Sequence, residues 1–292
     1  WAAMKPEIDT LACEGVGGLA GGTAYNVYGS GEPVVLIHGV GMEQAAWTAQ
    51  VEELAADYQL VVYDMFGHGK SRIPPEGVTL AAYADQLADL LDHLGITAAS
   101  VIGHSMGALV ALEFALGRPH RTTRVAALNA VFMRTPQQKA AVMARAAALK
   151  DAGVSATVDA TIARWFGTPV PDALRPSARM IAGILANVNA VGYARTYELF
   201  ATCDSVHADR LASLDMPALF MTAEFDPNSS PAMSAEMARR APQGALSVIP
   251  GARHMMNVTD PQEVNRRLRN FLEAPVNSHR QPGTATQATA GN

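Results

Sequence analysis

The sequence predicts an α/β fold, with a mostly parallel, doubly wound sheet and a helical cap inserted after the sixth core strand. Short apolar runs such as Val34 to Ile37 and Leu60 to Tyr63 recur along the chain and end in glycine-rich loops. Between them lie segments whose apolar residues are three and four positions apart, the spacing of an amphipathic helix. Strands that alternate with helices indicate a parallel sheet with right-handed crossovers. Residues 133–207 break the alternation because their periodic segments are all helical.

The composition is that of a soluble globular protein. Hydrophobic residues make up 49% of the 292 residues and charged residues 17%, and a net charge of -5 without a basic stripe argues against a nucleic-acid partner. No apolar run approaches the roughly 18 to 20 residues of a membrane-spanning helix. Cys13 and Cys203 lie outside any metal-binding spacing, so we expect two core thiols, no metal and no cofactor. We expect a cytoplasmic protein without a membrane partner, either monomeric or homo-oligomeric.

The first elements lead to a loop that suits a developing anion. Residues 21–28 alternate as a strand, and residues 33–37 form a strand buried on both faces that ends in His38-Gly39-Val40-Gly41. Open α/β sheets bind ligands at the carboxyl ends of their strands. We therefore expect the Val40 N–H to be one donor of an oxyanion hole, while His38 orders the loop and borders the substrate.

The next loop contains two residues of catalytic type that we interpret as structural. A helix is expected over residues 42–56 and a buried strand over residues 60–63, and the loop after it runs from Asp64 to Ser71. An aspartate commonly caps the amides of its own loop, and glycines mark tight turns. We therefore expect Asp64 and His68 to stabilise this loop.

The strongest signal is a sharp turn between an apolar strand and an apolar helix. A helix is expected over residues 80–94 and a strand over residues 98–102, and the turn then reads Gly103-His104-Ser105-Met106-Gly107, the Gly-x-Ser-x-Gly pattern of a nucleophile elbow. The glycines leave room where the chain reverses, so the Ser105 hydroxyl is exposed. The helix that starts at Met106 presents free N–H groups, and the Met106 N–H is the other expected oxyanion donor.

A helical cap is expected after a strand over residues 125–132. Its helices are expected over residues 136–150, 154–166, 176–190 and 192–201. Because the cap follows the carboxyl end of a strand, we expect it to cover the serine and to select substrates. The residues expected to touch a ligand are Arg134, Arg164, Trp165 and Tyr193. Either arginine could pair with a substrate carboxylate.

The core is expected to resume with two strands, over residues 217–222 and 245–249, which lead to Asp226 and His254. A final helix is expected over residues 261–271. The chain thus divides into a core of residues 1–132 and 208–274, a helical cap of residues 133–207, and a polar tail of residues 275–292 that we expect to be disordered.

Ser105, Asp226 and His254 have the chemistry of a catalytic triad. A serine hydroxyl needs a base within hydrogen-bond distance, and the base needs a carboxylate that fixes its tautomer and stabilises its charged form. All three residues follow strands at one edge of the sheet, in the order Ser, Asp, His. Glu224 is the competing acid because it follows the same strand as Asp226.

With these motifs the chain resembles the α/β-hydrolases from about Gly21 to Leu272. The resemblance rests on the loops His38 to Gly41 and Asp64 to Ser71, the elbow, Asp226, and the run Gly251 to His254. It implies that Ser105 attacks an ester or lactone carbonyl to form an acyl-enzyme, which water activated by His254 then hydrolyses.

The expected cap narrows the resemblance. Ala163 to Phe166 and Asn189 to Ala194 are similar to segments of the 3-oxoadipate enol-lactone hydrolases of aromatic catabolism. His104 stands where those lactonases more often carry leucine, and Ala108 replaces a frequent glycine. The resemblance implies a small carboxylic ester or lactone as the substrate.

Other activities of this fold stay open. Haloalkane dehalogenases and epoxide hydrolases use an aspartate at the elbow, so Ser105 argues against both. Carbon–carbon bond hydrolases and cofactor-free perhydrolases keep the serine and differ in the shape of the pocket. A non-catalytic ligand receptor is the alternative of a different class, and the triad and both oxyanion positions argue against it.

Overall fold

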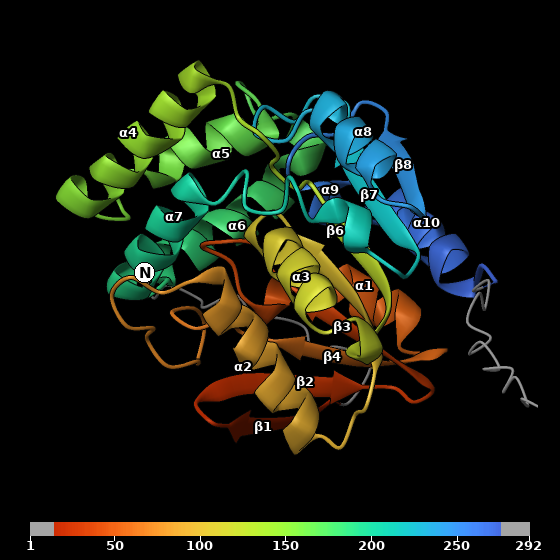
Figure 1. Ribbon diagram of the computed structural model, residues 1–292. Helices are drawn as coiled ribbons and strands as arrows, with labels where there is room; N and C mark the ends of the chain where they lie inside the picture. Colours follow the sequence, from red (N-terminus) through yellow and green to blue (C-terminus); the bar gives the residue numbers. More distant parts are fainter. Residues whose placement is uncertain (1–14, 276–292) are drawn as a thin grey trace, which may run out of the picture.

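A computed structural model describes residues 15–275, which form one mixed eight-stranded sheet with helices on both faces (Figure 1). Cys13 and residues 276–292 of the expected tail lie outside the described residues. The strand order is β1-β2-β4-β3-β5-β6-β7-β8. β2 pairs antiparallel with β1 and β4, and every other pairing is parallel. The strands are β1 (Val16–Ala20), β2 (Thr23–Tyr28), β3 (Glu32–Ile37), β4 (Tyr58–Tyr63), β5 (Ala99–His104), β6 (Thr122–Leu128), β7 (Ala218–Ala223) and β8 (Gly244–Ile249).

The helices are divided between the two faces of the sheet and one insertion. The helices that follow core strands are α1 (Thr48–Leu54), α2 (Leu80–His93), α3 (Met106–Gly117), α8 (Pro231–Arg240), α9 (Met256–Thr259) and α10 (Pro261–Glu273). The inserted helices, which lie between β6 and β7, are α4 (Pro136–Ala152), α5 (Val158–Phe166), α6 (Arg175–Asn187) and α7 (Ala190–Thr202). Figure 1 shows these four helices grouped together in green beside the sheet.

Side chains of the central strands alternate between two apolar cores. Val35 and Ile37 of β3 belong to the core formed with α2 and α3, whereas Val34 and Leu36 belong to the core formed with α1 and α10. All four side chains are therefore buried, which is why the sequence of β3 shows a continuous apolar run instead of an alternating one.

The winding direction of the sheet changes next to β3. β4 lies on one side of β3, whereas β5, β6, β7 and β8 follow in order on the other side. Open α/β sheets bind ligands at this kind of switch point, outside the carboxyl ends of the strands. The loops after β3 and β5 start there, and they contain Val40 and Ser105.

The expected α/β fold, with its mostly parallel sheet and inserted helices, is confirmed, but individual elements differ from the sequence prediction. β1 was not expected because two glycines weaken its strand signal; pairing with β2 holds it. The expected helix over residues 42–56 begins as a 3₁₀ turn, Gln44–Trp47. β6 ends at Leu128, short of residue 132, because the next residue, Asn129, has a φ of 52°. α8 was not expected, although its Ser230 cap and Pro231 start are usual helix signals.

The described residues contain neither a membrane-spanning helix nor a cluster of metal-ligand side chains. Between residues 15 and 275, no helix combines the length and the apolar character that a membrane crossing requires. In the same range, His, Cys, Asp and Glu side chains nowhere gather in a group of three or more that could hold a metal ion.

Candidate active site

The turn after β5 holds Ser105 in a conformation that side chains rarely adopt. Its φ is 54° and its ψ is -115°. The neighbouring glycines are required by close backbone contacts: a Cβ on Gly103 would lie 2.0 Å from the carbonyl oxygen of Gly107, and a Cβ on Gly107 would lie 2.3 Å from that of Ile37. The strained turn at Ser105 is therefore maintained by tight packing of β3, β5 and α3 around it.

The three residues predicted as a triad lie together. His254 Nε2 is 3.2 Å from Ser105 Oγ, and His254 Nδ1 is 2.8 Å from Asp226 Oδ2. All three side chains are buried. Because Asp226 can only accept when ionised, Nδ1 carries the proton, which leaves the Nε2 lone pair facing the serine hydroxyl. This arrangement allows a proton to move from Ser105 to His254.

Asp226 accepts more than the bond from His254. Asn129 Nδ2 donates to its Oδ2 at 2.8 Å, and the Asn228 N–H donates to its Oδ1 at 2.8 Å. Burial alone would raise the pKa of Asp226, but the charge and hydrogen bond of His254 together with these two donors lower it. Asp226 is therefore held as a carboxylate that can stabilise a charged His254.

Sequence reasoning missed Asn129. It directly follows β6, its φ of 52° turns the chain, and the hydroxyl of Ser229 donates to its carbonyl oxygen at 2.6 Å. The signal that could have found it is an asparagine at the end of a strand on the same edge as Asp226, since asparagine tolerates this backbone conformation. The expected extension of the strand to residue 132 hid it.

Glu224, the competing acid, occupies a different place. Its Oε2 accepts the Gly251 N–H at 2.8 Å, and the residue is exposed. Glu224 therefore supports the turn after β8, while Asp226 contacts His254.

Two backbone amides, in the loops that follow β3 and β5, have no hydrogen-bond partner within residues 15–275. The Ser105 N–H donates to the Leu128 carbonyl at 2.8 Å, so it is occupied. The N–H groups of Met106, the first residue of α3, and of Val40 have no hydrogen-bond partner within residues 15–275. Both positions are those expected of oxyanion donors.

Two buried histidines hold the loop that contains Val40. His38 donates from Nδ1 to the Gly39 carbonyl at 2.8 Å and accepts the Met65 N–H at Nε2, at 2.9 Å. His68 accepts the Gly41 N–H at Nε2, also at 2.8 Å. The residues on both sides of Val40 are therefore fixed by imidazole rings, and His38 acts on the loop as expected.

Burial keeps both histidines neutral. It lowers the pKa of His38 to about 4 and, together with the nearby His38 ring, lowers the pKa of His68 to about 3. A neutral ring has one donor and one acceptor nitrogen, which is the combination that these backbone contacts need.

Asp64 stabilises its own loop, which confirms the structural interpretation. Its Oδ2 accepts the Lys70 N–H at 3.0 Å, and its Oδ1 accepts the Gln44 N–H at 3.0 Å. The carboxylate thus ties the loop after β4 to the start of the 3₁₀ turn after β3.

Two rings lie against the imidazole of His254. The His104 ring is 5.1 Å away between centroids, and the Trp165 ring, from the last turn of α5, is 5.4 Å away at an interplanar angle of 32°. His104 Nε2 donates to the His254 carbonyl at 2.8 Å, which links the elbow to the main chain of the base. The structure therefore brings Trp165 to the triad, as expected for a residue of the insertion that borders the substrate.

Arg164 is partly buried and lacks an anionic partner. The only hydrogen bond of its guanidinium within residues 15–275 is a long one, 3.5 Å, to Thr161 of the same helix, and its Nε is buried without a partner. Burial lowers the pKa of Arg164. A second cation, Arg145 of α4, donates to the Tyr197 hydroxyl at 3.1 Å and likewise has no carboxylate within ion-pair distance in the described chain.

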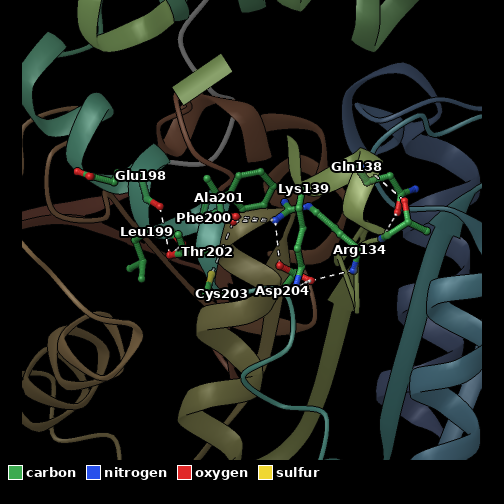
Figure 2. A network of polar contacts seen from close by, with 11 residues as sticks. Arg134, Gln138, Lys139, Glu198, Leu199, Phe200, Ala201, Thr202, Cys203 and Asp204 are labelled. Carbon is green, nitrogen blue, oxygen red and sulfur yellow. Dashed lines mark hydrogen bonds and ion pairs between the residues drawn. The ribbon is translucent and has the colours of Figure 1, made fainter. Parts of the chain in front are cut away.

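Arg134 has structural partners, shown in Figure 2. Its Nη1 lies 3.6 Å from Asp204 Oδ1 and donates to the Phe200 carbonyl at 3.0 Å, while its N–H donates to Asp204 Oδ2 at 2.8 Å. Asp204 also lies 3.8 Å from the ammonium group of Lys139. Arg134 therefore joins the two ends of the insertion, and of the two arginines expected to meet a substrate, Arg164 is the one without such partners.

Tyr193 of α7 lies beside the loop of Val40. A Cβ on Gly41 would lie 3.1 Å from the Tyr193 ring, and the ring is 6.3 Å from that of His68. Tyr193 is buried and packs at right angles to Tyr197, 5.8 Å away. It therefore covers the expected oxyanion loop from the side of the insertion.

Comparisons with known proteins extend over most of the chain. A family model described as the alpha/beta hydrolase family matches residues 34–267. The (E)-2-((N-methylformamido)methylene)succinate hydrolase of Acinetobacter baylyi is 36% identical over 249 residues, which cover 85% of this chain and 93% of the relative. The putative carbamate hydrolase RutD of Klebsiella pneumoniae is 30% identical over 251 residues, covering 84% of this chain and 92% of the relative.

Solved structures give the same picture of the fold. The enol-lactonase from Burkholderia xenovorans superposes with a TM-score of 0.80 at 24% identity, covering 89% of this chain and 100% of the other. A thermophilic esterase from Thermogutta terrifontis, solved with malate bound, superposes with a TM-score of 0.78 at 27% identity, covering 89% of this chain and 98% of the other.

Proposed function

Because the chain belongs to the alpha/beta hydrolase family, we propose that it is a serine hydrolase that cleaves a small carboxylic ester or lactone through an acyl-enzyme. The observation that carries the proposal is the buried chain of hydrogen bonds from Ser105 through His254 to Asp226 beside two unpaired amides. A serine without a base and an oxyanion site would be a poor nucleophile at neutral pH.

In the proposed reaction, Ser105 Oγ attacks the carbonyl carbon while His254 Nε2 takes the hydroxyl proton. The oxyanion of the tetrahedral intermediate accepts the N–H groups of Val40 and Met106. As the carbon–oxygen bond of the ester breaks, His254 returns the proton to the leaving oxygen, which leaves an acyl group on Ser105. Water then gives a proton to His254 and attacks this acyl group, and Ser105 recovers its proton as the acid leaves.

The unpaired Arg164 supports a substrate that carries a carboxylate. A partly buried guanidinium without an anion is costly, and a bidentate carboxylate is its best partner. The name of the Acinetobacter relative contains a succinate, and the Thermogutta esterase binds malate, so carboxylate ligands occur among similar proteins. We assign Arg164 the role of binding a substrate carboxylate, with Trp165 and Tyr193 shaping the pocket around it.

Hydrolysis of a carbon–nitrogen bond is the second candidate function. The two curated relatives at 36% and 30% identity are named as a hydrolase of a formamido compound and as a putative carbamate hydrolase. The same triad serves an amide, provided that His254 protonates the leaving nitrogen. The bond that is cleaved therefore depends on how the leaving atom is presented to His254.

A substrate panel tests these proposals. Wild type and Ser105→Ala are compared on p-nitrophenyl esters, simple lactones, a carboxylated enol-lactone, and a carboxylated enamide of the same size. We expect the carboxylated lactone to be preferred and all turnover to be lost in Ser105→Ala. Preference for the enamide would favour the second candidate, and binding without any turnover would favour a ligand receptor. Turnover in Ser105→Ala close to wild type would exclude the acyl-enzyme.

Arg164 is tested on the same panel. Arg164→Ala is expected to lower kcat/KM for carboxylated substrates by about tenfold to a hundredfold and to leave neutral esters nearly unchanged, because a charged hydrogen bond is worth about 1.5 to 3 kcal/mol. The matched control is Arg179→Ala, which removes an exposed arginine from α6 of the same insertion. Equal losses on neutral and carboxylated substrates would contradict the role of Arg164.

A further inference from the structure

The base of the triad must become a cation in an environment with little water. His254 is 2% exposed, and its neighbours His104 and Trp165 are 2% and 5% exposed. Forming an imidazolium in such a place is unfavourable unless fixed charges or dipoles replace the lost hydration. Asp226 supplies one such charge, at Nδ1. The faces of the ring need another source of stabilisation.

The indole of Trp165 lies against one of these faces. Its ring centroid is 5.4 Å from that of His254, within the roughly 6 Å at which a cation is attracted to an aromatic face, and the planes are tilted by only 32°. Tryptophan has the most favourable face for this interaction among the aromatic side chains. The side chain is buried, so water does not compete with the contact.

We propose that the indole of Trp165 stabilises the imidazolium form of His254 by a cation–π interaction while Ser105 attacks. The inference rests on the serine hydrolase function proposed above and adds a reason why the base can be charged inside the protein. Stabilising the imidazolium makes His254 a stronger base in the transition state, where its charge develops.

His104 does not supply the same stabilisation. Burial and the neighbouring His254 lower the pKa of His104 to about 3, so its ring stays neutral, and its Nε2–H is used by the His254 carbonyl. His104 therefore positions the base through the main chain. Trp165 is the aromatic ring left to act on the charge.

The other charged and titratable groups around the imidazole have opposing effects. Asp226 favours the imidazolium, whereas Arg164, whose Cζ is 5.9 Å from the Trp165 ring, disfavours it. His38 is neutral because burial lowers its pKa to about 4, and Arg253 precedes His254 in the chain. Only a change confined to the indole can separate its contribution from these charges.

Fluorinated tryptophan provides that change, because fluorine weakens the negative face of the ring and nearly preserves its shape. The chain has three tryptophans, Trp1, Trp47 and Trp165, so global labelling is compared in wild type and in Trp165→Phe. With mono- and difluorotryptophan we expect kcat to fall about two- to fivefold and the acid limb of the pH–rate profile to move to lower pH. In the Trp165→Phe variant, labelling should change neither kcat nor the pH–rate profile.

A second measurement separates this inference from the proposed function. The protonation of His254 is followed by NMR in the Ser105→Ala background, where fluorotryptophan should shift its titration to lower pH without any turnover. Serine-dependent turnover with neither the titration nor kcat changed would overturn the role of Trp165 and leave the hydrolase intact. A shifted titration in a protein without serine-dependent turnover would instead overturn the proposed function and, with it, the role of Trp165 in the reaction.

Discussion

At the scale of single residues, the site depends on two backbone conformations that side chains usually avoid. Ser105 and Asn129 both have positive φ values, 54° and 52°, and each directly follows a strand of the sheet. The turn at Ser105 presents its hydroxyl to His254, and the turn at Asn129 presents its amide to Asp226. The packed strands beneath supply the rigidity that keeps these turns in place.

The contact of Asp226 with His254 predicts that Asp226, and not Glu224, is the acid of the triad. Asp226→Asn should lower kcat by about a thousandfold or more, because the amide favours the wrong tautomer of His254 and cannot stabilise its charge. Glu224→Gln should lower kcat less than threefold, since within residues 15–275 the Gly251 N–H is the one hydrogen bond that Glu224 accepts. Both changes in kcat are measured by steady-state kinetics on a substrate that the wild type hydrolyses, with circular dichroism as a control for folding. If Asp226→Asn left kcat nearly unchanged while Glu224→Gln lowered it strongly, Glu224 would be the acid of the triad instead of Asp226.

The residues whose positions could be predicted from the sequence are those that a strand end places. Ser105, Asp226 and His254 each follow an apolar run, so topology alone brings them to one edge. The role of Arg134 could not be predicted in this way, because its partner Asp204 lies 70 residues further along the chain and is reached only when the insertion closes.

Asn129 and Trp165 show two further reasons why parts of the site could not be predicted from the sequence. The end of β6 depends on a local turn at Asn129 that continuous apolar residues conceal. The contact of Trp165 with His254 requires the tertiary placement of α5, which helical periodicity does not contain.

At the scale of elements, α3 is tied to the segment that returns from the insertion. Glu113 of α3 accepts a bond from His207 at 2.9 Å and one from Arg210 at 2.7 Å. These hydrogen bonds, that of His207 first, lower the pKa of Glu113 to about 2 in spite of its burial. The helix behind the nucleophile and the base of the insertion therefore share one carboxylate.

Glu113→Gln should lower the free energy of unfolding by about 2 kcal/mol at pH 7. Because folding depresses the pKa of Glu113 from about 4.5 to about 2, its contribution is complete above pH 4.5 and is lost as the pH falls through 2. The difference from wild type should shrink accordingly in urea titrations between pH 5 and pH 2.5. Glu236→Gln is the control: its carboxylate also has two basic side-chain partners, Arg239 and Arg240, but at the surface, and its loss should change stability little. A difference at Glu113 that does not depend on pH would contradict this account.

At the scale of the whole molecule, α7 is fastened to the core by direct backbone contact. A Cβ on Gly192 of α7 would lie 2.3 Å from the Cα of Gly67 in the loop after β4. Two hydrogen bonds extend this line of contact between α7 and the core, which we call the seam. The hydroxyls of Tyr83 and Thr196 are 2.7 Å apart, and Arg195 donates to the Pro74 carbonyl at 2.7 Å. The insertion is thus joined to the core along α7 as well as at its ends.

Gly192→Ala should therefore disturb the relation of the insertion to the site. We expect the free energy of unfolding to fall by about 1 to 3 kcal/mol, because the added methyl forces the seam apart. kcat/KM should also fall, since Tyr193 is the next residue. Gly183→Ala in α6 is the matched control, because its Cβ meets nothing within 4 Å and alanine favours the helix, so it should stabilise by up to about 1 kcal/mol. Equal melting temperatures for the two variants would argue against a tight seam.

The seam along α7 also sets where the chain can be recombined. A graft that exchanges residues 136–187 for the matching helices of another hydrolase would leave the Gly67–Gly192 contact and the Arg134–Asp204 pair untouched. A graft that extends through Gly192 of α7 would have to rebuild the Gly67–Gly192 contact. Chimeras designed to acquire new substrates should therefore keep α7 with its native loop and choose donors that restore an indole over His254.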